Sequence, residues 1–244
     1  MKIVGIDLAW KSQNNTTALA IGELVGDMFQ VDIVHEALAG LDEIVDVVYQ
    51  EGDVQGVAID APLIITNQLR SRSCERELSK EYGGRGASCH PSNLNLYPRP
   101  TSFILSSRLQ EKGFKHLIPP NRGRWQLECY PHPAIIEIFG LSYRLPYKKG
   151  TVAEKQRGQA NLAKRIKSLE ESQILRIKIE KGAEQFLSER RIFSNKGLKL
   201  KKNEDGLDSI LCAYIGALYA RSVSAKTFGS IETGYIYVPQ QKCI

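Results

Sequence analysis

The spacing of apolar residues at the start of the chain predicts three strands. A short, nearly continuous apolar run at 3–6 ends at Asp7, which is typical of a central strand buried on both faces. Residues 17–24 form a second strand-like run, and alternating apolar residues at 29–33 form a third. Because only short turns separate the runs, they predict an antiparallel meander.

The next segment changes from strand spacing to helix spacing and back. Apolar residues within 41–48 recur at helical intervals, and Gly52 is placed to end that helix. Residues 54–60 are another buried strand, which ends at Asp60 before Pro62. A helix between two strands predicts a crossover to a parallel neighbour. The expected order is therefore strand, strand, strand, helix, strand.

The middle of the chain has weaker periodicity. Residues 70–82 fit a helix, whereas five prolines within 91–120 argue against regular structure nearby. Residues 125–130 resume as a strand, with Gln126 and Glu128 on the face opposite its apolar residues. Pro133 suits the first turn of a short helix that follows.

The last part of the chain is predicted to be mainly helical. Residues 152–192 are charged and helix-prone with a sparse apolar stripe, and residues 196–202 are expected to form a basic loop. Asn203 is a good N-cap for a helix whose buried face lies within 207–218. A final short strand is expected at 235–238.

Composition places few further limits on function. The chain has 244 residues, of which 42% are apolar and 25% charged, as in ordinary soluble domains. No apolar run is long enough to span a bilayer, and Asp7 interrupts the apolar N-terminus, so a signal peptide is not expected. Five widely spaced cysteines favour a reducing compartment. We therefore expect a cytoplasmic protein with no membrane partner.

The net charge of +6 is unevenly distributed. Residues 61–125 hold eleven Lys/Arg and four Asp/Glu, a balance of +7, so the rest of the chain has a balance of −1. Such a segment either faces a polyanion or is a solvated basic insertion. The arginines expected to contact a phosphate backbone are Arg70, Arg72, Arg76, Arg122 and Arg124.

Carboxylates occur where strands or helices are expected to converge. Asp7, Asp60 and Glu128 lie at or near the ends of strand-like runs, and Asp208 borders the apolar stripe of a helix. Clustered acids repel one another and resist burial, and a shared Mg²⁺ or Mn²⁺ would relieve both costs. Asp205 lies three residues before Asp208 on the same side of the helix, although a first-turn acid can also simply complement the helix dipole.

Two neighbouring residues leave alternatives open. Glu128 is either a further metal ligand or a group that supports the ligands. His132 is either a proton-transfer group or metal neighbour, or an ordinary hydrogen-bonded histidine. The chain has no phosphate-binding P-loop, no GxGxxG and no GxSxG motif, which argues against several common enzyme classes.

Several short strings together resemble one family. They are GIDLAW at 5–10, IDAPL at 59–63, RSCEREL at 72–78, ECYPHPA at 128–134 and NEDGLDSILCAY at 203–214. In this order they resemble the domain-of-unknown-function 429 family, whose members are predicted to be ribonuclease H-like nucleases. The resemblance implies an α/β fold, a ribonuclease H-like mixed five-stranded sheet flanked by helices, with a helical and loop insertion.

The resemblance also implies an organisation and a site. One domain would span 1–244, with a basic insertion at about 61–124 and a helical insertion at about 150–195. Asp7 would match the first-strand aspartate that contacts both metal ions in that fold. The expected metal ligands are Asp7, Asp60, Asp205 and Asp208. The expected catalytic residues are Asp7, Asp60, Glu128, Asp208 and His132.

The leading hypothesis is a metal-dependent nuclease that uses two Mg²⁺ or Mn²⁺ ions on DNA or RNA. One alternative is a phosphohydrolase or phosphotransferase that acts on a nucleotide or another small phosphate. The other is a ribonuclease H-like module that binds nucleic acid without cleaving it.

Overall fold

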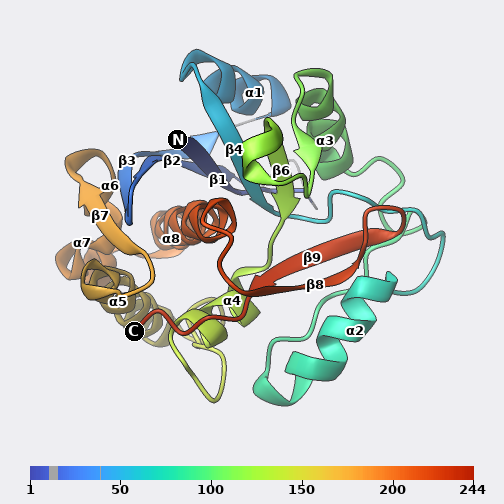
Figure 1. The fold of residues 1–244 in the computed structure, drawn as a ribbon. Helices are drawn as coiled ribbons and strands as arrows, with labels where there is room; N and C mark the ends of the chain where they lie inside the picture. Colours follow the sequence, from blue (N-terminus) through green and yellow to red (C-terminus); the bar gives the residue numbers. More distant parts are fainter. Residues whose placement is uncertain (11–15, 39) are drawn as a thin grey trace.

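A mixed seven-stranded sheet forms the centre of the computed structural model, which describes residues 1–10, 16–38 and 40–244 (Figure 1). Its strand order is β5-β6-β4-β1-β2-β3-β7, and β8 pairs with β9 in a separate hairpin. The strands are β1 (Lys2–Asp7), β2 (Thr17–Val25), β3 (Met28–Leu38), β4 (Val54–Asp60), β5 (Lys115–His116), β6 (Trp125–Glu128), β7 (Arg176–Glu180), β8 (Ala225–Ser230) and β9 (Gly234–Pro239).

Helices cover both faces of this sheet (Figure 1). The α-helices are α1 (Leu41–Gln50), α2 (Ser73–Tyr82), α3 (Thr101–Glu111), α4 (Pro131–Ile138), α5 (Val152–Ser168), α6 (Lys181–Glu184), α7 (Glu189–Ser194) and α8 (Gly197–Ala220). The strands β1, β2 and β3 form the expected antiparallel meander, and α1 crosses over to β4, which is parallel to β1.

The sheet has two more strands than the five that were expected. Among the described residues, β5 adds two residues beside β6, and β7 pairs in parallel with β3 at the other edge. The strand β5 is too short for periodicity, whereas apolar and polar residues alternate over 175–180 at β7, a strand pattern that the expectation of helices across 152–192 passed over. The supported description is a mixed α/β fold with a mostly parallel sheet.

The core has a layer on each face of the sheet. The side chains of α8 pack on one face with Ile3, Ala58 and Leu127, while α1 and α3 cover the other face with Val4 and Ile59. Helix α8 lies directly against β1 at Gly5, where a Cβ atom would collide with the backbone of the helix. This close approach brings the acids of α8 to the end of β1.

The segment from 61 to 124 is more regular than its prolines suggest. Helix α2 packs against the β8–β9 hairpin in a small apolar cluster of its own. Helix α3 forms between the prolines, because Pro100 stands at its N-cap position rather than inside it. The expectation of no regular structure in 91–120 is therefore wrong for this stretch.

The start of α8 also differs from expectation. The helix begins at Gly197, so residues 196–202 are not a loop and Asn203 is not its N-cap. The Asn203 amide is buried inside the helix and donates to Gln159 Oε1 and the Phe186 carbonyl. Tertiary partners therefore satisfy the group that the sequence suggested would cap the helix. It follows that Asp205 lies beyond the first turn, so the dipole explanation for this residue fails.

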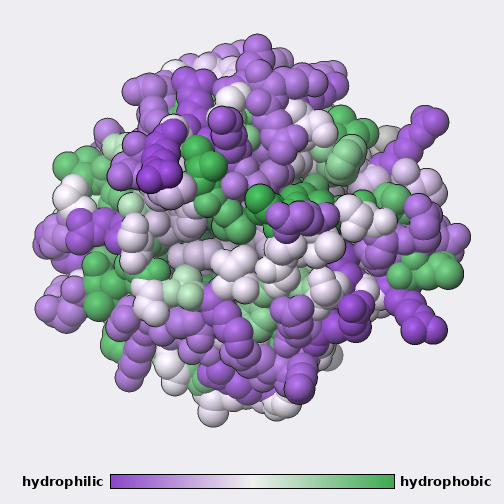
Figure 2. All heavy atoms as spheres, turned by 45° about the vertical axis from the view of Figure 1, so that its right-hand side comes forward, coloured by the Kyte–Doolittle hydropathy of each residue, from purple (hydrophilic) through white to green (hydrophobic). Residues whose placement is uncertain are grey.

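The surface is mostly hydrophilic, and the cysteines form no disulfide bonds. Figure 2 shows hydrophilic side chains over most of one face, with hydrophobic residues interspersed among them. None of the helices in the described ranges is both long and apolar enough to cross a bilayer. All five cysteines are free thiols.

Candidate functional site

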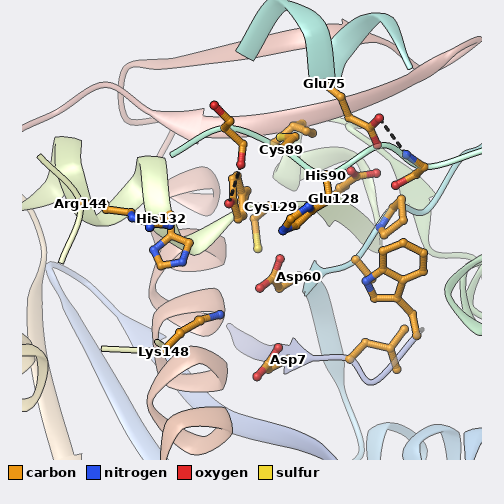
Figure 3. Close-up of a pocket in the computed structure, with 18 of the residues that line it drawn as sticks. Asp7, Asp60, Glu75, Cys89, His90, Glu128, Cys129, His132, Arg144 and Lys148 are labelled. Carbon is orange, nitrogen blue, oxygen red and sulfur yellow. Dashed lines mark hydrogen bonds between the residues drawn. The ribbon is translucent and has the colours of Figure 1, made fainter. Parts of the chain in front are cut away.

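Asp7 and Asp60 lie side by side at the ends of neighbouring parallel strands. They are direct partners in the register of β1 and β4. Two residues before them, Gly5 and Ala58 face α8, so alternation directs both aspartates to that same face. Figure 3 shows the two carboxylates pointing into one cavity, with Lys148 reaching toward them.

Helix α8 brings two more acids to the same region, but each already has a partner. Asp208 is 0% exposed; its Oδ1 accepts from the Tyr147 hydroxyl at 2.7 Å, and its Oδ2 lies 2.7 Å from Lys148 Nζ. Asp205 Oδ1 lies 2.6 Å from Lys201 Nζ. Between described residues, no ion pair includes Asp7 or Asp60.

The pKa values reflect this crowding of acids. Burial, followed by the charge of Asp208, raises the pKa of Asp7 well above its usual range. Burial raises the pKa of Asp60 to about 7, with Lys148 opposing the shift and Asp208 adding to it. Burial alone would lower the pKa of Lys148, but the carboxylates around it outweigh burial and raise it well above normal. Lys148 is therefore the resident cation of the cluster.

The cavity has a volume of about 350 Å³, within the range of small-ligand sites. Asp7 and Asp60 line it, whereas Asp205 and Asp208 do not. Its other walls carry the acids Glu75 and Glu128, the cations Arg72, Arg144, Lys148 and Lys149, and the residues Trp10, Cys89, His90, Tyr130 and His132. Because Glu75 and Glu128 are paired with Arg72, a ligand in the cavity would meet the carboxylates of Asp7 and Asp60 and the cationic groups of the other three basic residues.

Glu128 also lines the cavity, but it has a structural partner. It follows the alternation of β6 onto the face opposite Leu127, where Arg72 donates to both of its carboxylate oxygens, at 2.9 and 2.5 Å. The Leu63 amide donates a third hydrogen bond, at 2.8 Å. Arg72 also pairs with Glu75 at 2.8 Å. Both oxygens of Glu128 are thus engaged, which favours the supporting group over the metal ligand of the two alternatives left open by the sequence.

His132 is a neutral imidazole in the wall of the cavity. It is 8% exposed and lies between the rings of Tyr130 and Tyr147, with centroid distances of 5.7 and 5.3 Å. Burial, followed by the charges of Lys148 and Arg144, lowers its pKa well below the usual value. Its Nδ1 atom is buried, and no described residue supplies a hydrogen-bond partner.

Comparison with protein families identifies the chain. The model of one family, described as protein of unknown function (DUF429), matches residues 5–228. The chain belongs to the DUF429 family. Comparisons with curated proteins and with solved structures gave no match. The family resemblance expected from the short sequence strings is therefore confirmed, while the description of the DUF429 family assigns no activity.

The arginines expected to form a phosphate track are not brought together in this DUF429 protein. Arg72 is 3% exposed and lies in the wall of the cavity, where it is fixed in the ion pairs described above rather than exposed on a surface track. Arg70 and Arg76 are exposed near the start of α2. Arg122 and Arg124 precede β6, at the end of the parallel strands opposite the aspartates.

Three other cations that line the cavity come from a segment that sequence reasoning missed. Arg144, Lys148 and Lys149 lie in the loop between α4 and α5 of the DUF429 domain. The available signal was the basic, aromatic string YRLPYKKG at 143–150, which directly follows the helix that carries His132. This string lies outside residues 61–125, the segment that carries the excess of positive charge.

Proposed function

We propose that this protein hydrolyses phosphodiester bonds of nucleic acid at a divalent-metal site formed by Asp7 and Asp60. The observation that carries the proposal is the register of these two aspartates on adjacent parallel strands, where both open into a cavity lined by cations. A phosphate group entering the cavity would meet acids suited to a hard cation and basic groups suited to its own charge.

We further propose that the fold is ribonuclease H-like. Five strands in the order β6-β4-β1-β2-β3 form the centre of the sheet, and the strands β5 and β7 extend its two edges. The antiparallel meander, the crossover helix α1 and the acid-bearing helix α8 support this assignment. The family match supports it only indirectly, because its description gives neither fold nor activity.

The residues present fit a Mg²⁺ or Mn²⁺ ion that uses few protein ligands. Among the residues described by the structure, no three His, Cys, Asp or Glu side chains form a ready-made metal cage. Mg²⁺ commonly uses one or two carboxylates and completes its shell with water and substrate phosphate. Asp7 and Asp60 supply such a pair. The bound ion would supply Lewis-acid polarisation and a more acidic bound water.

The protein's own side chains would orient and neutralise the substrate. In hydrolysis, a water oxygen bonds to phosphorus, the bond from phosphorus to one ester oxygen breaks, and that oxygen gains a proton while the water loses one. Arg144, Lys148 and Lys149 line the cavity and would offset the charge of the phosphate. His132, held neutral by its surroundings, is available as a proton acceptor.

A cleavage assay tests this proposal. End-labelled DNA and RNA, single-stranded, double-stranded and branched, would be incubated with Mn²⁺ and the wild-type, Asp7→Asn or Asp60→Asn protein. The wild type should cleave at least one substrate, and each variant should lose most of that activity. Asp53→Asn is the matched control, because Asp53 is exposed just before β4 whereas Asp60 ends it. Wild-type activity in Asp60→Asn would contradict the proposal, and an inactive wild type would favour the binding-module alternative.

The concave shape of the site favours one alternative substrate class. A cavity of about 350 Å³ has the size of a site for a nucleotide or another small phosphate. Mononucleotides would then be turned over, or would compete strongly with the labelled nucleic acid. Weak competition by mononucleotides would favour the polymeric substrate.

A further inference from the structure

The positive charge beside Asp208 is the ammonium group of Lys148. We infer that Lys148 fills the position that a second divalent ion would otherwise take, so that the protein binds one ion, at Asp7 and Asp60. This inference rests on the proposed metal site and departs from the two-ion arrangement expected from the sequence.

The first support is the pairing of Asp208: Oδ1 accepts a hydrogen bond from a tyrosine, and Oδ2, which has no hydrogen bond from a described residue, is in ion-pair contact with a lysine. Its two oxygens are contacted by consecutive residues, Tyr147 and Lys148, each at 2.7 Å. The carboxylate is 0% exposed and lies outside the lining of the cavity. A metal ion could reach Asp208 only by displacing these partners. An ammonium group beside the carboxylate also repels a dication and satisfies the same negative charge.

The second support is the way the loop is fixed. The backbone at Pro146 and Tyr147 packs directly on α5 at Gly158, where a Cβ atom would collide with both residues. Gly140 and Gly150, at the two ends of the loop, have φ angles of 59° and 109°, which glycine adopts readily. Lys148 is therefore presented to the acids by a buttressed backbone and is only 25% exposed along its side chain.

The acids of α8 differ from the strand-end acids Asp7 and Asp60 in having lysine partners. Asp205 pairs with Lys201, one helical turn earlier on α8, and shares this lysine with Glu204. Asp205 and Asp208 are thus each paired with an ammonium group, whereas no ion pair between described residues includes either strand-end acid, and these two are left for a cation from the cavity. This division assigns α8 an electrostatic and structural role, and leaves metal binding to β1 and β4.

Metal stoichiometry tests the inference without reference to catalysis. Mn²⁺ binding would be measured by titration calorimetry and by electron paramagnetic resonance on the wild type, Lys148→Met, Lys148→Met/Asp208→Asn and Lys149→Met. The wild type should bind one ion. Lys148→Met should bind a second ion, or bind the first at least tenfold more tightly, because Asp208 becomes available. The double variant should lose this gain, since it removes the carboxylate as well.

Lys149→Met is the matched control, because it removes the same charge from the next residue, for which no ion pair with a described residue is found. Its stoichiometry should stay at one. If Lys148→Met folds only when Mn²⁺ is present, the metal has replaced the missing ammonium group, which supports the inference.

Two results would overturn the inference, and they differ in their consequence. Two ions on the wild type, with Mn²⁺-dependent cleavage intact, would reject the role of Lys148 and leave the proposed function standing. No ion on the wild type would reject both. The wild-type measurement alone decides between these results, so the inference stays testable even if Lys148→Met does not fold.

Discussion

Asp60 imposes a cost on the metal-free protein that can be measured. The pKa of Asp60 rises from 3.8 to about 7 in the folded state, chiefly through burial. At about 1.4 kcal/mol for each pKa unit, this corresponds to roughly 4 kcal/mol of lost stability when Asp60 is fully ionised. Between these pKa values the native state holds more protons than the unfolded state. The free energy of unfolding should therefore fall as pH rises through this window and level off above about pH 7.

Asp60→Asn should remove this cost, because the amide has the same shape and no charge. The variant should be more stable than the wild type by about 1.5 kcal/mol near pH 5 and by about 4 kcal/mol near pH 8. No hydrogen bond between described residues involves the Asp60 carboxylate, so the substitution removes no known partner. The same variant should be inactive, which gives opposite signs for stability and activity.

Urea unfolding with EDTA at the two pH values measures the difference directly. Asp53→Asn, at the exposed start of the same strand, should change the free energy of unfolding by less than about 0.5 kcal/mol at either pH. An Asp60→Asn protein that is no more stable than the wild type near pH 8, or whose gain does not grow with pH, would refute the reasoning.

Further substitutions and conditions test other parts of the structure. Arg72→Met should destabilise the fold by about 3–5 kcal/mol in urea unfolding, because it leaves Glu75 and Glu128 buried without their cation, whereas the exposed Arg76→Met should cost less than about 0.5 kcal/mol. Gly5→Ala should cost at least about 1–3 kcal/mol, since its Cβ would collide with the α8 backbone; an unchanged melting temperature would contradict that packing. Added Mn²⁺ should stabilise the wild type, by about 2.7 kcal/mol at a free concentration one hundred times Kd, and an unchanged melting curve would argue against the metal site. Lys149→Met should reduce the slope of log affinity for nucleic acid against log salt by about one, whereas Arg122→Met, at the far end of the strands, should leave it unchanged.

The placement of Asp7 and Asp60 could be read from the sequence. Each ends a buried apolar run, and the intervening helix predicted a parallel crossover, which brings the ends of both strands to one edge of the sheet. The three-residue spacing of Asp205 and Asp208 likewise gave their common side on the helix. These inferences needed only local periodicity and one topological rule.

The face of Glu128 was also available from the sequence. Alternation along 125–130 already put Glu128 opposite the apolar side chains, and those side chains pack toward α8 in the structure. The possibility that Glu128 binds metal came from its carboxylate, whereas the alternation of the strand placed it on the face away from α8. The buried partner, Arg72, was hidden because burial of an arginine depends on acids that are distant in sequence.

The roles of Lys148 and Tyr147 could not be predicted from local pattern. Their loop reaches Asp208 only because α5 buttresses it at Gly158 and α8 crosses β1 at Gly5. Similarly, the basic run at 196–202 resembled a loop before a helix capped by Asn203, but the helix begins at Gly197 and the Asn203 amide has tertiary hydrogen-bond partners instead of capping it. In each case a long-range contact outweighed the local preference.

The most direct test of the central claim is the anomalous scattering of manganese in crystals of the wild-type protein soaked with Mn²⁺. We expect one strong peak within coordinating distance of both the Asp7 and the Asp60 carboxylates, with Lys148 still paired to Asp208. A map with no peak at that pair of aspartates, in crystals with the cavity open to solvent, would contradict it.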